Sequence, residues 1–233
     1  MCSNKKKYED GMILKVDKPI GWTSFDIVNK IRSTLKLKKI GHAGTLDPLA
    51  SGLLIVCTGK YTKKIHEYQD FDKEYIGSFV IGKSTPSHDL ETEFISSKSI
   101  KNVTKDKIIK TTKTFLGNQY QTPPKYSAIK INGERAYKKA RNNEKVILKP
   151  REVRINKFQI TSINLPKIDF VINCSKGTYI RSIARDYGNK LKVGAFLNEL
   201  KRTKIGNISI NDSISIEELI SKIKKDLNED NKK

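Results

Sequence analysis

The chain has 233 residues, with 46 Lys or Arg against 25 Asp or Glu, and its formal net charge is +21. Its three cysteines are scattered, and no apolar run approaches the roughly 18 residues of a membrane helix, which excludes a disulfide-stapled secreted domain and a membrane-spanning protein. The lysine-rich start lacks the apolar stretch of a secretory signal, so a cytoplasmic protein is expected.

The apolar pattern alternates between strand and helix periods along the chain. Polar tails are expected at residues 1–11 and 228–233, with one domain over residues 12–227 between them. Apolar runs predict strands at Met12–Val16, Leu53–Cys57, Tyr75–Ile81, Val153–Ile160 and Ile168–Cys174. Stripes at helical spacing predict helices that begin at Thr23 or Ser24, at Thr104, at Ile180 and at a Ser215–Glu218 capping box. Short strands mixed with helices, without strict alternation, favour an α+β fold with a largely antiparallel or mixed sheet.

The densest unusual segment is a glycine-punctuated loop, GHAGTLDPLASG, at Gly41–Gly52. Its glycines allow a tight bend or a close approach to a ligand, and Pro48 restricts Asp47 to extended backbone. Asp followed by Pro is also a typical helix start, with Asp as the N-cap. Because Ala50–Gly52 would interrupt such a helix within one turn, we favour a site that presents His42 and Asp47.

Two residues elsewhere in the chain are candidates to act with Asp47. Arg181 is expected in the first turn of a helix, where a cation opposes the helix dipole, and this placement suggests a nearby anion such as Asp47. Such a pair would keep the carboxylate ionised, whereas an Arg181 that points into solvent is the alternative. Tyr75 closes the run DKEY, and its ring either stacks on an extruded base or lies in the core.

The charge excess favours a polyanionic partner, and nucleic acid is the first candidate. Only eight of the basic residues are arginines, however, and an excess of Lys, Ile and Asn is also what an AT-rich genome produces. The run Lys36–Lys39 is therefore either a solvated face or a phosphate-facing surface. The paired prolines in QTPPKYSAIK (Gln121–Lys130) make a stiff extended stretch, which is either functional or a structural edge.

Together these segments resemble bacterial tRNA pseudouridine synthases of the TruB type. The matching segments follow family order between Met12 and Gly206: VDKPIGWTSFD, GHAGTLDPLASGLL, DKEY, QTPPKYSAIKINGERAYKKAR, CSKGTYIRSIARDYG and LKRTKIG. GHAGTLDPLASG is close to diagnostic for this branch, whereas residues 88–105 match only loosely. The resemblance implies the pseudouridine synthase fold, α+β with a bifurcated mixed, largely antiparallel sheet flanked by helices. It also implies that the C-terminal PUA domain of longer members is missing here.

The resemblance further implies an isomerase that converts uridine-55 in the T loop of tRNA to pseudouridine by base flipping, with no metal and no cofactor. Asp47 would be the catalytic carboxylate, with Arg181 as its partner and Tyr75 stacking on the base. Residues that bind the substrate would be His42, Tyr75, Tyr179 and Leu200. Residues with supporting roles would be Lys18, Pro19 and Lys130.

Several alternatives stay open at this point. Asp47 could attack C1′, attack C6 or abstract a ribose proton. A non-catalytic RNA-binding or ribosome-associated protein would fit the charge equally well, and so would a pseudouridine synthase with another RNA target. The coexistence of Asp47, Tyr75 and Arg181 in separate motifs favours the enzyme, because a binding module needs no acid in a basic cleft. We expect a monomer that binds the tRNA T stem-loop, without a membrane or an obligate protein partner.

Overall fold

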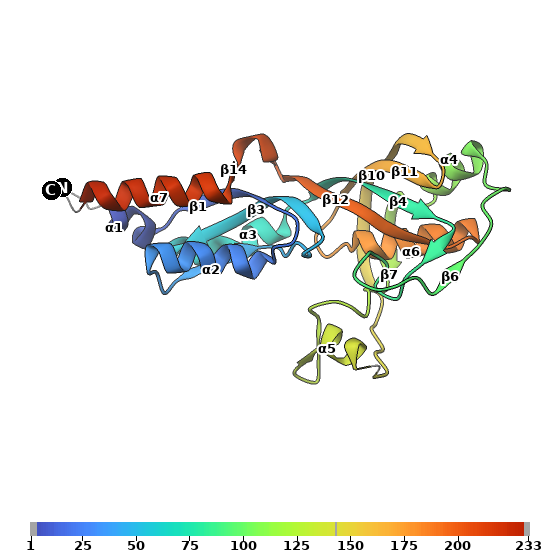
Figure 1. The fold of residues 1–233 in the computed structure, drawn as a ribbon, viewed down its shortest axis with the longest axis horizontal. Coiled ribbons are helices and arrows are strands. Elements are labelled where there is room, and N and C mark those ends of the chain that lie inside the picture. The colour runs from blue at the N-terminus through green and yellow to red at the C-terminus, as the bar shows by residue number, and fades with distance from the viewer. Residues whose placement is uncertain (1–3, 143, 231–233) are drawn as a thin grey trace. The chain divides into compact units, whose positions relative to one another are not determined.

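The computed structural model describes residues 4–142 and 144–230 (Figure 1). The chain forms two compact units, and the expectation of one domain over residues 12–227 stays a prediction. Unit 1 comprises Met1–Tyr75 and Leu200–Lys233, and unit 2 comprises Ile76–Glu199. None of the helices in the described ranges has the length and apolar character that a bilayer crossing requires.

Unit 1 is built on a mixed sheet with strand order β14-β1-β3-β12, in which β2 also pairs with β3 and β13 with β12. Its strands are β1 (Ile13–Lys18), β2 (Ile40–Ala43), β3 (Ala50–Thr58), β12 (Ala195–Ile205), β13 (Ile208–Ser209) and β14 (Ile214–Ser215). β3 pairs antiparallel with β1 and β2 and parallel with β12, while β1 pairs parallel with β14. β12 begins in unit 2 and enters unit 1 at Leu200.

Helices cover both faces of the unit 1 sheet, which explains the continuous apolar run of β3. The helices are α1 (Asn4–Asp10), α2 (Ser24–Leu35), η1 (Gly59–Lys64), α3 (Ile65–Asp70), η2 (Ile210–Asp212) and α7 (Ile216–Asp230). Leu54 and Val56 pack with the buried faces of α2 and α7. Leu53 and Ile55 join a second cluster, against which α3 packs through Ile65. A strand that is buried on both faces reads as an unbroken hydrophobic run.

Side-chain caps begin α2 and α7 where the sequence predicts them. Thr23 Oγ1 accepts a hydrogen bond from Asp26 N at 3.0 Å, and Asp26 Oδ2 accepts one from Thr23 N at 2.8 Å. The same reciprocal pattern joins Ser215 and Glu218 at 3.0 and 3.1 Å. These boxes satisfy amides at the helix starts that have no partner within the helix, so both predicted starts are confirmed.

The expectation of a polar N-terminal tail is wrong for residues 4–10, which form α1. Tyr8 is only 2% exposed, its hydroxyl donates to Asp226 Oδ2 on α7 at 2.6 Å, and its carbonyl accepts from Thr58 Oγ1 at 2.7 Å. Tyr8 is therefore the buried anchor of a helix whose other residues are polar. On the other side of this contact, α7 continues to Asp230, past the expected boundary at Leu227.

Unit 2 contains the strand order β4-β11-β10-β7. Its strands are β4 (Lys73–Ile81, which begins in unit 1), β7 (Gly117–Gln121), β10 (Arg151–Asn164), β11 (Lys167–Cys174) and the short pairs β5 (Lys83–Ser84) with β6 (Ser96–Ser97) and β8 (Lys130–Ile131) with β9 (Glu134–Arg135). β10 pairs antiparallel with both β11 and β7. Its helices are α4 (Lys105–Lys113), α5 (Ala136–Arg141) and α6 (Ile180–Leu191).

The core of unit 2 is aromatic. Phe79 of β4 and Phe170 of β11 have ring centroids 4.3 Å apart, and Phe158 of β10 lies 5.7 Å from Tyr187 of α6. The predicted inward face of α6 is buried as expected, at Ile183, Ala184, Tyr187 and Leu191. Both units thus combine helices with a mixed, largely antiparallel sheet, which is the predicted α+β class.

Candidate active site

Asp47 lies in a short loop of unit 1 between β2 and β3. The Ala50 amide donates to the Asp47 carbonyl at 3.0 Å, so Asp47–Ala50 forms a turn. The alternative that Asp47 and Pro48 begin a helix is therefore wrong. His42 lies just before this loop, on β2, where it pairs with Val56.

Hydrogen bonds hold the loop on both sides of Asp47. Ser24 Oγ accepts from Leu46 N at 2.9 Å and donates to Leu46 O at 3.1 Å. On the other side, Gly21 N donates to Pro48 O at 2.8 Å. Asp47 itself is half-buried. The start of α2 and the turn before it thus position the half-buried carboxylate, and both derive from the segment VDKPIGWTSFD.

Lys18, the last residue of β1, is fully buried in unit 1. Its ammonium donates to Pro19 O at 2.9 Å and to Trp22 O at 2.6 Å, and so braces the turn that contacts Pro48. Burial lowers the pKa of Lys18 to about 8, and the charges of Asp47 and Arg202 act on it in opposite directions. Supporting roles for Lys18 and Pro19 stay predictions, and this backbone brace is their structural basis.

Three further site candidates also belong to unit 1. Burial lowers the pKa of His42, the nearby Arg202 charge lowers it further, and a backbone hydrogen bond at Gly44 opposes both effects. Leu200 is half-buried on β12 and stands opposite Ala50, the residue that closes the Asp47 turn. Tyr75, on β4, is only 8% exposed. Unit 1 therefore gathers the predicted carboxylate, the histidine and the leucine around one loop.

Tyr179 and Arg181 belong to unit 2, at the start of α6. Tyr179 is the N-cap residue, and the side chain of Gln121 binds its main chain twice: Oε1 accepts from Tyr179 N at 2.8 Å, and Nε2 donates to Tyr179 O at 3.2 Å. Ser182 Oγ donates to Thr122 O at 2.8 Å. The end of β7 thus fixes the first turn of α6. The sequence offered a signal for this in QTPPK, but no role was assigned to Gln121.

Arg181 is 4% exposed, so the alternative that it points into solvent is wrong. Its Nη1 lies 3.4 Å from Asp89 Oδ2, and Asp89 is also buried. An anion near this first helical turn was expected, and Asp89 is one within unit 2. Asp89 falls in the stretch that resembles the family only loosely, and sequence reasoning missed it. A pair with Asp47 would join the two units and stays a prediction.

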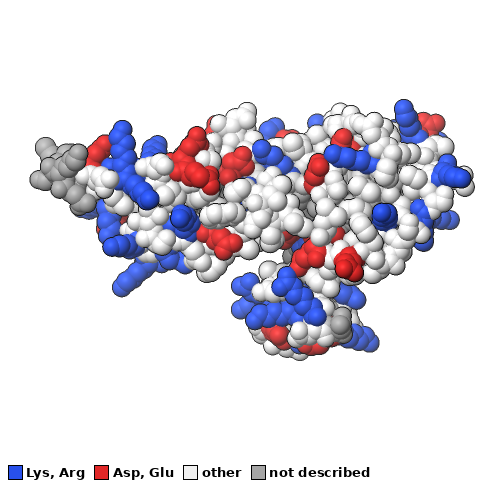
Figure 2. All heavy atoms as spheres, in the orientation of Figure 1, with Lys and Arg blue, Asp and Glu red and all other residues white. Residues whose placement is uncertain are grey.

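The segment 122–151 carries much of the positive charge of unit 2. It has nine Lys or Arg and two Glu, and Figure 2 shows blue side chains gathered over it around α5. A small core of Ala136, Ala140 and Val146 holds it together. Lys130 is exposed on β8 within this segment, and its supporting role stays a prediction.

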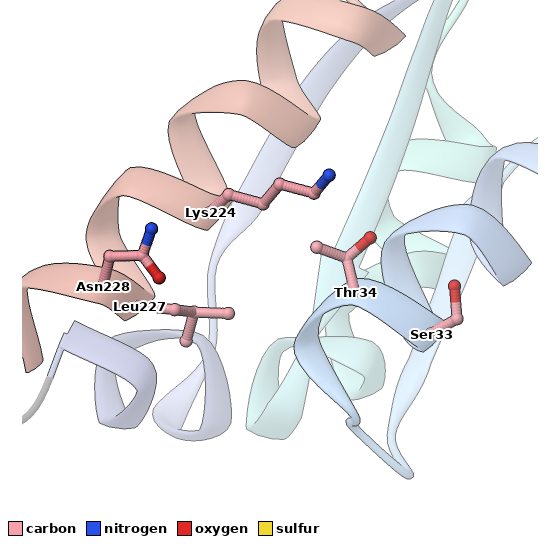
Figure 3. A pocket seen from close by; sticks show the side chains of 5 residues that line it. All are labelled: Ser33, Thr34, Lys224, Leu227 and Asn228. Atoms are coloured by element: carbon pink, nitrogen blue, oxygen red, sulfur yellow. The ribbon is translucent and has the colours of Figure 1, made fainter. Parts of the chain in front are cut away.

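A cavity of about 380 Å³ lies between α2 and α7 (Figure 3). Its lining consists of Ser33, Thr34, Lys224, Leu227 and Asn228. Ser33 follows Ser24, which contacts the Asp47 loop, by nine residues, or about 14 Å along the helix. None of the predicted site residues lines this cavity, so the cavity lends no support to the predicted site, and the Asp47 loop stays the candidate.

Comparison with known proteins assigns this chain to a family. The family model described as TruB family pseudouridylate synthase (N terminal domain) matches residues 32–180. The tRNA pseudouridine synthase B of Flavobacterium johnsoniae is 49% identical over 218 residues, which cover 91% of this chain and 95% of that protein. The tRNA pseudouridine synthase B of Phocaeicola vulgatus is 44% identical over 216 residues, which cover 90% of this chain and 92% of that protein.

A solved structure agrees with the sequence relatives. A chain in the crystal structure of a Cbf5-Nop10-Gar1 complex superposes with a TM-score of 0.72 and 28% identity, over 94% of this chain and 56% of that one. The chain thus spans little more than half the length of that neighbour. The family model and the two relatives match most of the length of this chain. The chain therefore belongs to the TruB family of pseudouridylate synthases.

Proposed function

We propose that this protein isomerises a uridine of tRNA to pseudouridine, with uridine-55 of the T loop as the target. Both relatives are named tRNA pseudouridine synthase B and match 91% and 90% of this chain. The net charge of +21 supports a polyanionic substrate. The observation that carries the proposal is Asp47, a half-buried carboxylate whose two neighbours, Leu46 and Pro48, are both held by hydrogen bonds.

The proposed reaction rearranges one nucleotide. The C1′–N1 glycosidic bond breaks, the uracil turns in place, a C5–C1′ bond forms, C5 loses its proton and N1 gains one. Asp47 serves as the ionised carboxylate, by attack on C1′, by attack on C6 or by abstraction of a ribose proton. The isomerisation exchanges no electrons with another molecule, so it requires no redox cofactor and no energy donor.

The uridine must leave the T-loop stack before Asp47 can reach it. We assign stacking on the extruded base to Tyr75, packing into the vacated T loop to His42, and contacts in the uridine pocket to Tyr179 and Leu200. The lowered pKa of His42 supports this assignment, because the shift favours the neutral ring. A neutral ring packs among bases without a charge to desolvate.

We also propose that Arg181 pairs with Asp47, as the resemblance implies. The buried, fixed guanidinium of Arg181 supports this role, because Asp89 holds it at 3.4 Å. The expected enzyme is a monomer that binds the T stem-loop in the cytoplasm. Cys57, a buried free thiol of unit 1, supports a reducing setting of this kind; Cys2 lies outside the described residues.

The test is conversion of tRNA by Asp47→Asn, measured as pseudouridine at each uridine of the T loop. The amide has the same shape but can act neither as nucleophile nor as base, so conversion should fall by at least about 10³-fold. Affinity for tRNA should hold or rise, because one negative charge is removed.

The matched control is Asp10→Asn, which removes one carboxylate from an exposed ion pair with Lys60 in the same unit. This variant should convert tRNA at the wild-type rate. If Asp47→Asn also did so, the active-site assignment would fail, and a non-catalytic RNA-binding role would gain support.

A further inference from the structure

Arg202 is a buried arginine to which the sequence assigns no role. It lies on β12, two residues after Leu200, and only 1% of its surface is exposed. Its backbone stands opposite Gly52 of β3. Gly52 has φ +106°, and a Cβ there would collide with the Arg202 carbonyl. β12 and β3 thus meet at a point that only glycine can occupy.

The guanidinium of Arg202 joins the two ends of the Asp47 loop. Nε donates to Leu53 O at 2.8 Å, and Nη2 donates to Gly44 O at 3.1 Å. Gly44 and Leu53 flank the segment 45–52, which carries Asp47. One planar side chain therefore sets the separation between the start and the end of the loop.

The chemistry at this position requires an arginine. All donors of a lysine lie on one nitrogen, whereas the guanidinium carries donors on separate nitrogens in a fixed plane, so Nε and Nη2 can each bind a different carbonyl. Gly44 has φ +86°, a backbone conformation that favours glycine, and a Cβ there would lie in ordinary van der Waals contact with Nη1, at 3.5 Å.

Electrostatics give Arg202 a further connection to the site. The buried guanidinium of Arg202 donates to two main-chain carbonyls, which carry partial negative charge. Its field reaches both Lys18 and His42, and it lowers the pKa of each. Burying a charged guanidinium costs desolvation free energy, and an apolar side chain would stabilise the fold about as well.

We propose that Arg202 is a positioning residue for the isomerisation, which holds both ends of the Asp47 loop so that the carboxylate keeps its reactive orientation. It touches neither substrate nor reacting atoms and acts through Asp47. The proposal rests on the proposed function of Asp47. A displacement of a reacting group by about 1 Å costs on the order of 10²-fold in rate.

The test uses Arg202→Lys, which keeps the charge and most of the stem but loses one carbonyl bond. The single-turnover rate at saturating tRNA should fall about 10²-fold, while the dissociation constant for tRNA changes less than about threefold. The matched control is Arg32→Lys on α2 of the same unit, whose guanidinium donates to Asn29 Oδ1 at 2.7 Å. Its rate should stay within about twofold of wild type.

A second readout does not depend on activity. Hydrogen exchange at the Ala50 amide, which closes the Asp47 turn, should speed up about 10-fold or more in Arg202→Lys, while exchange at Val56, in the middle of β3, stays unchanged. If the wild type converted no tRNA uridine but this change were seen, the proposed function would fall and the loop brace would stand.

Three results would overturn the proposal. The first is an unchanged rate at saturating tRNA together with an unchanged Ala50 exchange. The second is a loss confined to tRNA affinity, which would make Arg202 a substrate contact. The third is loss of folded structure in both Arg202→Lys and Arg202→Met, which would assign the side chain to stability alone.

Discussion

At the residue scale, Lys18 shows how burial sets the chemistry beside Asp47. A fully buried ammonium is disfavoured relative to the neutral amine, and the pKa of Lys18 falls to about 8. Its two carbonyl partners, Pro19 and Trp22, retain it at the end of β1. Lys18 is therefore charged at neutral pH, but it is poised to lose its proton in mildly alkaline solution.

This shift predicts a pH dependence of stability that one substitution removes. Between pH 8 and about 10.4, the unfolded chain holds a proton on Lys18 that the folded chain has released. Unfolding then takes up protons, so this contribution to the free energy of unfolding rises with pH, by up to about 3 kcal/mol. Below pH 8 both states are charged, and the contribution is constant at its lower value.

The measurement is urea unfolding of wild type and Lys18→Met from pH 7 to 10. The difference in free energy of unfolding between the two should change steadily in favour of wild type above pH 8. Lys15→Met, on the same strand with a half-exposed ion pair to Asp212 at 3.7 Å, should follow the wild-type curve. A constant difference between wild type and Lys18→Met would show that Lys18 titrates alike in both states.

At the element scale, the Tyr8 hydroxyl is one of the contacts that hold α1 against α7. Tyr8 bonds Asp226 of α7 at 2.6 Å, and Lys7 lies 2.8 Å from the same carboxylate. Tyr8→Phe keeps the buried ring but leaves Asp226 without this donor, so the free energy of unfolding should fall by about 1–2 kcal/mol. Urea denaturation measures the loss, and Tyr120→Phe, a change at a 78% exposed ring, provides the control.

The same contact predicts where Tyr8→Phe acts. Trypsin should cut at Lys5 to Lys7 faster in this variant, because α1 opens without the rest of unit 1. Unchanged cleavage together with an unchanged unfolding curve would mean that the Tyr8 hydroxyl is not needed to dock α1.

The sequence predicts those helices and strands whose own spacing of apolar residues, or whose own capping residues, indicate which positions are buried. The stripe of α6 and the caps of α2 and α7 are local signals, because periodicity and capping involve residues within one or two turns. α1 has one buried residue, so it presents no period. The roles of Gln121 and Arg202 arise from partners 58 and 149 to 158 residues away in the chain, and no local pattern encodes such distances.

The candidate site also contains residues that a local pattern predicts and residues that only the fold brings together. Asp47 is a candidate because Gly41–Gly52 is locally unusual, and the family motifs supply the partners expected for it. Asp89 lies outside those motifs, and only the fold brings its carboxylate to Arg181. The placement of Arg181 at the start of α6 did predict an anion nearby, because the positive end of a helix repels a cation. A buried cation at the start of α6 thus calls for an anion, and Asp89 is one such anion within unit 2.

At the scale of the whole molecule, the +21 charge is either functional or a product of genome composition. The basic segment 122–151 offers a way to decide, because its lysines are concentrated on a small substructure with few acids. Each lysine that neutralises a tRNA phosphate adds close to one unit to the slope of log affinity against log salt. Lysines that merely face solvent add nothing to that slope, because they release no counterions from the tRNA phosphates.

The closing prediction compares two sets of three exposed lysines from unit 2. In the first variant Lys138, Lys145 and Lys149 of the basic segment become Ala, and in the second Lys107, Lys110 and Lys113 of α4 become Ala. The first variant should bind tRNA more weakly at low salt, with a slope shallower than wild type by about 2–3 units. The second should keep the wild-type slope. Because both variants lose the same net charge, a difference between them reflects position and not total charge. Equal slopes in all three proteins would assign the lysines of both sets to genome composition, whereas equal losses in both variants would extend the RNA-binding surface from the basic segment to α4.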